Sequence, residues 1–78
     1  MSAKSSERQV VAERITVGLI PKVVQELDDL QRKTGMSKTD LVNRAVSLYS
    51  FIQEHLARGE ELRLFDPKDQ KEQQVHLL

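Results

Sequence analysis

The stretch Glu13-Arg14-Ile15-Thr16-Val17-Gly18-Leu19 decides how this chain can fold. Its residues alternate between apolar and polar or small, with the period of two that is typical of a half-buried β-strand. Two helical patterns follow it directly, so the strand has no obvious neighbour to pair with. Because an unpaired strand leaves backbone amides and carbonyls without partners, we expect this stretch to find a second strand.

A first helix is predicted over 21–34. Pro21 suits the first position of a helix, where no amide hydrogen is needed. Apolar residues recur at helical spacing on one face of this segment, and charged residues cover the remainder. Gly35 then supplies the left-handed conformation with which many helices end.

A second helix is predicted over 38–57, ending before Arg58-Gly59. Ser37 has the character of an N-cap, and Asp40 three residues later resembles the second half of a capping box. The apolar stripe of this helix is wider than one short partner helix needs, which suggests that a second copy of the chain covers part of it. The stripe consists of Leu41, Val42, Ala45, Val46, Leu48, Tyr49, Ile52 and Leu56.

The C-terminal segment is predicted to be a β-hairpin. Leu62–Phe65 and Gln74–Leu78 are two short runs of strand character, separated by the turn-rich stretch Asp66–Lys71. The chain is thus divided into a flexible arm (1–9), a strand–helix–helix domain (10–58) and a hairpin extension (59–78). The expected fold class is α+β and mostly helical.

Composition favours a small oligomeric protein. A single core in 78 residues supplies roughly 3–5 kcal/mol, and the absence of cysteine excludes both disulfides and a thiolate zinc site as reinforcement. No apolar run approaches the roughly 18 residues of a membrane span, and the polar N-terminus does not resemble a secretory signal. We therefore expect a cytoplasmic protein without membrane contact.

Charge is balanced over the whole chain but not along it. Twelve basic and twelve acidic residues cancel, which argues mildly against nucleic-acid binding. Residues 1–38, however, carry seven basic and five acidic side chains, and residues 39–78 carry five basic and seven acidic ones. The distribution permits a basic face, and a dimer would double the asymmetry.

The order of strand, proline-started helix, turn and longer apolar helix resembles the ribbon-helix-helix (MetJ/Arc/CopG-like) family of bacterial DNA-binding proteins. The resemblance covers about residues 13–57 and rests on Arg14-Ile15-Thr16-Val17-x-Leu19-x-Pro21 and on Gly35-Met36-Ser37-Lys38-Thr39-Asp40-Leu41-Val42-Asn43-Arg44-Ala45. It implies a homodimer in which two strands pair antiparallel and the four helices form the core. The two-stranded ribbon would then enter the major groove of double-stranded DNA.

In this arrangement, Ile15, Val17 and Leu19 face the helices, and the alternate residues face outward. Arg14 is expected to contact a guanine, and Thr16 to contact a base or a thymine methyl group. The competing interpretation is that both side chains merely cover the solvent face of a sheet. Gly18, the third outward position, departs from the family pattern, which commonly has a polar side chain there; it either allows close approach to DNA or marks a bulge.

Phosphate contacts are expected at the start of the second helix, where backbone amides lack helical partners. Ser37, Lys38 and Thr39 are the candidate residues, by resemblance to proteins that clamp the DNA backbone at this point. The alternative is an ordinary capped helix. Lys4 and Arg8 on the N-terminal arm are candidates for additional, salt-dependent phosphate contacts, or belong to a solvated tail.

Chemistry other than binding is not predicted. His55 and His76 are far apart and lack neighbours at metal-ligand spacing, so no metal site and no cofactor are expected. No set of nucleophile, base and acid is visible, and there is no glycine-rich phosphate loop. We therefore expect a protein that is not an enzyme.

The leading hypothesis is a nucleoid-associated transcriptional repressor that binds its operator as a dimer, with tandem dimers on repeated sites. Two alternatives remain open. In one, residues 60–78 bind a partner protein, as the C-terminal segment of an antitoxin binds its toxin. In the other, the hairpin pairs with residues 13–19 of the same chain and gives a monomeric α+β domain without a DNA-binding ribbon.

Overall fold

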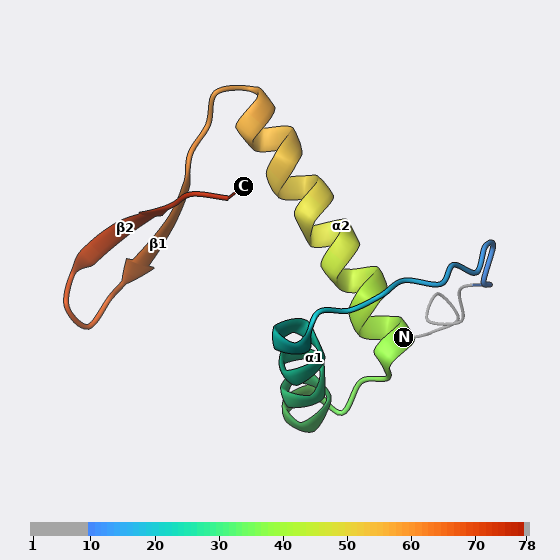
Figure 1. Ribbon diagram of the computed structural model, residues 1–78. Coiled ribbons are helices and arrows are strands. Elements are labelled where there is room, and N and C mark those ends of the chain that lie inside the picture. Colours follow the sequence, from blue (N-terminus) through green and yellow to red (C-terminus); the bar gives the residue numbers. More distant parts are fainter. Residues whose placement is uncertain (1–9, 78) are drawn as a thin grey trace, which may run out of the picture.

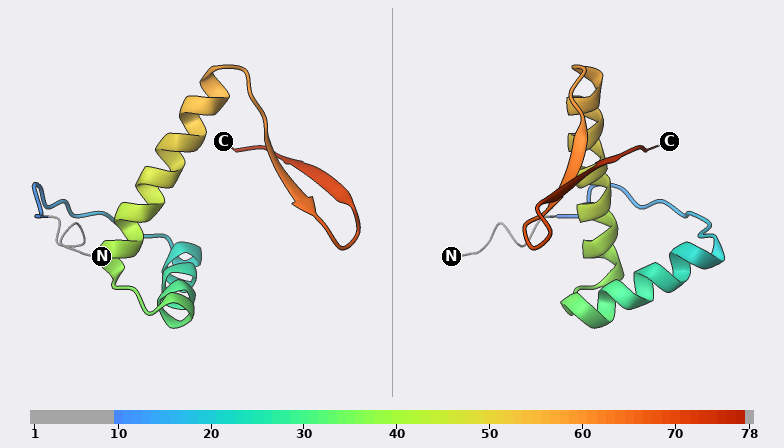
Figure 2. Two further views of the ribbon diagram at one scale, coloured as in Figure 1. Left: turned by 180° about the vertical axis from the view of Figure 1, so that it is seen from behind. Right: turned by 90° about the vertical axis from the view of Figure 1, so that its left-hand side faces the viewer.

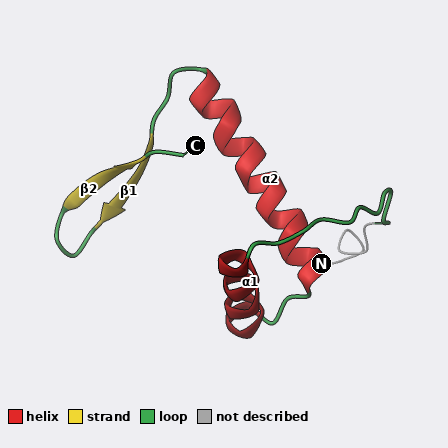
Figure 3. Ribbon diagram, viewed as in Figure 1, coloured by secondary structure: helices red, strands yellow, loops and turns green. Residues whose placement is uncertain are grey.

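The computed structural model describes residues 10–77, which form two helices followed by two strands (Figure 1). Helix α1 spans Pro21–Thr34 and helix α2 spans Lys38–Ala57, so both predicted helices are confirmed. Strands β1 (Leu62–Asp66) and β2 (Lys71–Val75) form a two-stranded antiparallel sheet. The described part of the chain therefore has a small α+β architecture, with helices and strands in separate halves (Figure 3).

One residue at each end, Pro21 and Gly35, determines where α1 begins and where it ends. Pro21 occupies the first turn, and the carbonyl of the extended residue Ile20 accepts hydrogen bonds from the Val23 and Val24 amides at 2.9 and 3.0 Å. At the other end, Gly35 adopts a φ of 73° and donates its amide to the Gln31 carbonyl at 2.9 Å. A residue with a Cβ is disfavoured in that conformation, which explains the glycine.

Helix α2 begins at the predicted cap. The Ser37 hydroxyl oxygen accepts a hydrogen bond from the Asp40 amide at 3.1 Å, and the Ser37 carbonyl accepts one from the Leu41 amide at 3.0 Å. Two backbone amides of the first turn are thereby bonded, which fixes the direction in which α2 leaves the turn.

The two helices enclose very little. Helix α1 lies beside the N-terminal end of α2, while the hairpin is attached to the opposite end (Figure 2). Leu41 is the one buried apolar side chain among the described residues, at 8% exposure, and Val46 further along α2 is 65% exposed. The chain exposes 7167 Å². A compact protein of its mass would expose roughly 4,800 Å². Many apolar side chains of the described residues are exposed, among them Ile15, Leu48 and Phe51 at 58–70%.

The hairpin is confirmed, but its second strand begins earlier than predicted. Its register runs from Leu62 opposite Val75 to Asp66 opposite Lys71, so pairing includes residues 71–73, which the sequence pattern does not mark as strand. The cause is the turn: the Asp66 carboxylate accepts a hydrogen bond from the Lys68 amide at 2.9 Å. Gln70 adopts a φ of 57°, and the loop closes after four residues. Pairing of β1 with β2 therefore begins directly after the loop, at Asp66 opposite Lys71.

The strand predicted over residues 13–19 is not formed in the single chain. Residues 10–20 form neither helix nor strand, and the sheet in the described part of the chain consists of β1 and β2 alone. The hairpin therefore does not supply the missing partner, and the three-stranded monomeric domain is not the observed fold. A ribbon made from this segment would need a second chain and stays a prediction.

The Ser37 cap gives a direct test of this part of the fold. Replacing Ser37 with alanine removes the acceptor for the Asp40 amide and should lower the free energy of unfolding by about 1 kcal/mol. Urea unfolding followed by circular dichroism measures the change. The matched control is Ser47→Ala, at an exposed position in the middle of α2, which should be neutral or slightly stabilising. Equal effects of the two substitutions would contradict the capping role.

Candidate nucleic-acid interface

The predicted base-contacting residues lie in the extended segment that precedes α1. Arg14 and Thr16 are exposed, and Arg14 makes no hydrogen bond or ion pair with any described residue. The alternate residues are exposed as well: Ile15, for example, is 70% exposed. The face predicted to pack against helices is thus uncovered in one chain, and the polar face is free to meet a ligand.

Gly18 has no role in the conformation of the single chain. A Cβ built on this residue would meet no atom within 4 Å, and its φ lies outside the left-handed region. Neither crowding nor backbone strain therefore accounts for the glycine. Close approach to DNA and a bulge in a ribbon, the two interpretations offered by the sequence, both stay predictions.

The amino end of α2 is the candidate phosphate-binding site, and one of its backbone amides is already bonded within the chain. The Asp40 amide donates to the Ser37 hydroxyl oxygen and is therefore not available to a ligand. The amides of Lys38 and Thr39 make no hydrogen bond with the described residues, and the Lys38 ammonium forms no ion pair with them. Two N–H groups and one cation at a helix N-terminus suit a phosphate oxygen. The carboxylate of Asp40 in the same turn weakens this attraction.

The remaining predicted contacts cannot be placed, because Lys4 and Arg8 lie outside the described residues, as does the whole of the arm predicted over 1–9.

The structure places the other predicted site residues in two separate groups. One is the extended segment with Arg14, Thr16 and Gly18, and the other is the start of α2 with Ser37, Lys38 and Thr39. Within the second group, Ser37 is already used as a cap.

The opposite end of α2 has a different character. An open cleft of about 190 Å³ lies where α2 gives way to β1. It is lined by Phe51, Ile52, His55, Leu56, Glu60, Glu61 and Leu62. The Nδ1 atom of His55 lies 2.7 Å from a Glu60 carboxylate oxygen, and the His55 ring lies against the Phe51 ring with centroids 4.4 Å apart. The first contact joins α2 to the linker that leads into β1, and the second lies within α2.

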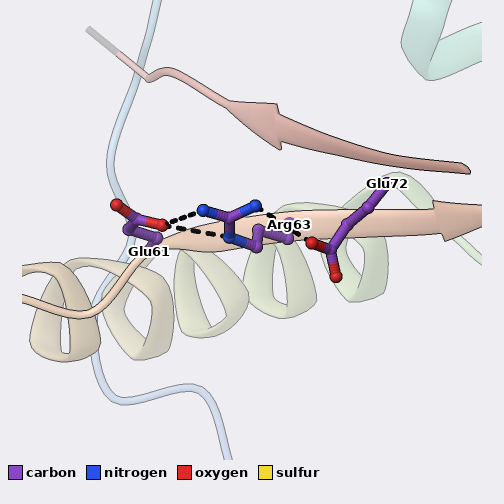
Figure 4. A network of polar contacts seen from close by, with 3 residues as sticks. All are labelled: Glu61, Arg63 and Glu72. Carbon is purple, nitrogen blue, oxygen red and sulfur yellow. Dashed lines mark hydrogen bonds and ion pairs between the residues drawn. The ribbon is translucent and has the colours of Figure 1, made fainter.

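The one arginine of the hairpin is held between two carboxylates (Figure 4). The Nε atom of Arg63 donates to Glu61 and its Nη1 atom donates to Glu72, each at 3.0 Å. The hydrogen bond and charge of Glu61, with a further contribution from Glu72, raise the pKa of Arg63. Residues 59–78 carry five acidic and three basic side chains, so the hairpin is a poor surface for DNA.

Sequence reasoning missed this arginine network because it depends on the hairpin register. With β2 starting at Gln74, Glu72 falls in the turn and away from Arg63. The observed register places Glu72 opposite Phe65, diagonal to Arg63 on the same face of the sheet. The signal that would have found it is Asp66-Pro67, which can close a turn through the aspartate side chain.

Comparisons with known proteins do not place the chain in a family: no family model matches it, and no curated protein or solved structure shows significant similarity to it. Across residues 10–77, no helix has the length and apolar character needed to cross a membrane. The same residues contain no cluster of three or more histidine or carboxylate side chains arranged to hold a metal ion.

Gly18 and Gly59 form a matched pair for testing these assignments, because both have open space around the Cβ position. Gly59 has a φ of 86°, so Gly59→Ala should cost about 1 kcal/mol of unfolding free energy. Gly18→Ala should leave the stability of the DNA-free protein unchanged or slightly raised. Urea titration of both variants measures this. A loss at Gly18 as large as that at Gly59 would show that Gly18 is constrained without DNA.

Proposed function

We propose that this protein is a homodimeric, sequence-specific DNA-binding regulator, in which residues 13–19 of two chains pair as an antiparallel ribbon and enter the major groove. The observation that carries the proposal is the exposed, alternating segment before α1. It has strand periodicity, and its apolar face is uncovered in a single chain. A second copy of the same segment satisfies its backbone, and a second pair of helices covers its apolar face.

The uncovered stripe of α2 supports the dimer. Val42, Val46 and Tyr49 lie on neighbouring positions of the helix surface and are all exposed. Obligate homodimer interfaces are more hydrophobic than other interfaces and resemble a domain core cut in half, and the exposed apolar side chains of α2 suit such an interface.

Pairing about a two-fold axis gives the ribbon one face that packs on the helices and one face that is directed outward. Side chains alternate across a strand, so apolar residues directed to the helices leave Arg14 and Thr16 directed outward. A two-stranded ribbon fits the major groove, where an arginine can bind guanine O6 and N7 with both ends of its guanidinium group. Such a contact discriminates between bases by about 1–3 kcal/mol.

The start of α2 supplies contacts that do not depend on sequence. The amides of Lys38 and Thr39, together with the Lys38 ammonium, would hold phosphates flanking the ribbon. Ser37 keeps the helix end in place by bonding the Asp40 amide. We propose repression as the regulatory outcome, since a dimer bound in the groove of an operator excludes other proteins from that site.

The dimer is tested by Val46→Lys. This substitution places a charge on the exposed stripe of α2 and should shift the protein to unfolded monomers at micromolar concentration, because each dimer would bury two unpaired ammonium groups. Sedimentation equilibrium and circular dichroism measure mass and helicity. Ser47→Lys is the control: at about 100° per residue this exposed position lies opposite the middle of the stripe, so the variant should remain dimeric. A wild-type chain that sediments as a folded monomer would contradict the dimer.

DNA binding is tested by selecting bound sequences from random DNA, then measuring Arg14→Ala and Lys38→Ala on the selected site. Arg14→Ala should lose about 1–3 kcal/mol on that site and relax its preference at one base pair. Lys38→Ala should weaken all sequences alike and lower the salt-dependence slope by about one for each phosphate that is no longer neutralised. Lys68→Ala, in the hairpin turn, removes the same charge as Lys38→Ala and should change neither property.

A specific result would overturn the ribbon. If Arg14→Ala kept both the affinity and the base preference of the wild-type dimer, the segment 13–19 would not be the element that reads DNA.

A further inference from the structure

The hairpin exposes apolar side chains that no other part of the described chain covers. A two-stranded sheet is marginally stable in water unless something packs on it. Of the residues in β1 and β2, only Leu62 lines the cleft at the end of α2, and the hairpin projects away from the helices (Figure 1). Leu64 is 60% exposed and Phe65 is 56% exposed, both within β1.

The two outer edges of this sheet are unequal. The exposed residues of β2 are Lys71, Glu72, Gln73 and Gln74, a polar run of the kind that protects an edge from other strands. Strand β1 carries Leu64 and Phe65 and lacks proline, and its one cation is neutralised by Glu61 and Glu72. The edge of β1 is therefore the one suited to accept another strand.

Strand β1 is also complementary to itself. In an antiparallel pair centred on Leu64, Leu64 lies opposite Leu64 of the second copy, and Arg63 lies opposite Phe65. The edges of the Arg63 guanidinium are bonded to carboxylates, but its face remains available to stack on an aromatic ring. No like charges are opposed at these positions. The same construction on β2 gives only polar pairs.

We propose that the hairpin is a self-pairing module, in which β1 of one chain pairs antiparallel with β1 of another to form a four-stranded sheet of order β2-β1-β1-β2. Applied to the proposed DNA-binding dimer, on which this step rests, the module joins one dimer to the next. It is attached at the end of α2 remote from Lys38, about 30 Å along the helix, so it stays accessible when the start of α2 is on DNA.

The small area of the β1–β1 contact determines how strongly two dimers associate. Five residues per strand bury far less than the surface of a stable interface, so the pairing is weak between free dimers. Two dimers on adjacent sites are held close together, and the weak contact then acts at a high effective concentration. The expected result is cooperative occupation of neighbouring operator sites.

The absence of cysteine from the chain allows a clean test. A thiol at position 64 would face its counterpart at a Cα separation of about 4.5–5.5 Å, within the range of a disulfide. Under mild oxidation, full-length Leu64→Cys should therefore form covalent dimers roughly tenfold faster than Gln73→Cys. Gln73 is the matched control because it lies opposite Leu64 in the hairpin, is also exposed and belongs to the other edge.

The mass of the native, cross-linked protein separates this proposal from the proposed function. A tetramer supports both. A covalent dimer from a chain that is monomeric under reducing conditions supports hairpin pairing and contradicts the DNA-binding dimer. A covalent dimer from a chain that is already dimeric when reduced contradicts the joining of dimers, since the hairpins would then pair within one dimer.

The proposal is overturned if Leu64→Cys and Gln73→Cys cross-link equally slowly, or if Gln73→Cys is faster. Capture of a foreign protein by β1 would also leave Leu64→Cys without a self-cross-link. As a second measurement, Leu64→Lys should abolish cooperativity on DNA with two adjacent sites while leaving the affinity for one site unchanged. Retained cooperativity would contradict the module.

Discussion

Backbone hydrogen bonding is the constraint on which the rest of this structure depends. A helix satisfies its own amides and carbonyls, but a strand does not. Across residues 10–77 the helices α1 and α2 form fully and β1 and β2 bond to each other, while the segment before Pro21 has periodicity suited to a strand and no strand beside it. Ile15 in that segment is 70% exposed. In the proposed dimer, a second copy of the chain would supply both a neighbouring strand and a cover for this side chain.

The sequence predicts the local elements well because their signals are local. Pro21, Gly35 and Ser37 act on neighbouring backbone groups, and the bounds of both helices follow from them. The predicted start of β2 is too late because it depends on the Asp66 carboxylate closing the turn, a contact that strand periodicity does not record. The candidate site is predicted only by pattern. The contact proposed for Arg14 is with another molecule, so no local signal in this chain determines it, and the single chain shows only that Arg14 is exposed.

The two ends of α2 have opposite chemistry, and this polarity organises the proposed functions. The end near Lys38 offers two amides and a cation that the described residues leave without partners, which suits an anionic ligand. The end near His55 leads into a hairpin whose arginine is neutralised by two carboxylates. Placing nucleic acid at one end and protein contacts at the other allows both kinds of binding at the same time, since neither surface overlaps the other.

The isolation of Leu41 has a consequence for how the protein folds. Burying one leucine contributes about 1.5–3 kcal/mol, whereas ordering the backbone costs about 1–2 kcal/mol for each residue. In the proposed dimer, folding would therefore coincide with association, because Leu41 is the one buried apolar side chain among the described residues of a single chain. Folding would then be second order in chain, and its midpoint would depend on protein concentration. Newly made chains of the proposed dimer would remain open to proteases until enough of them accumulate, so the level of synthesis would set a threshold for the amount of folded protein.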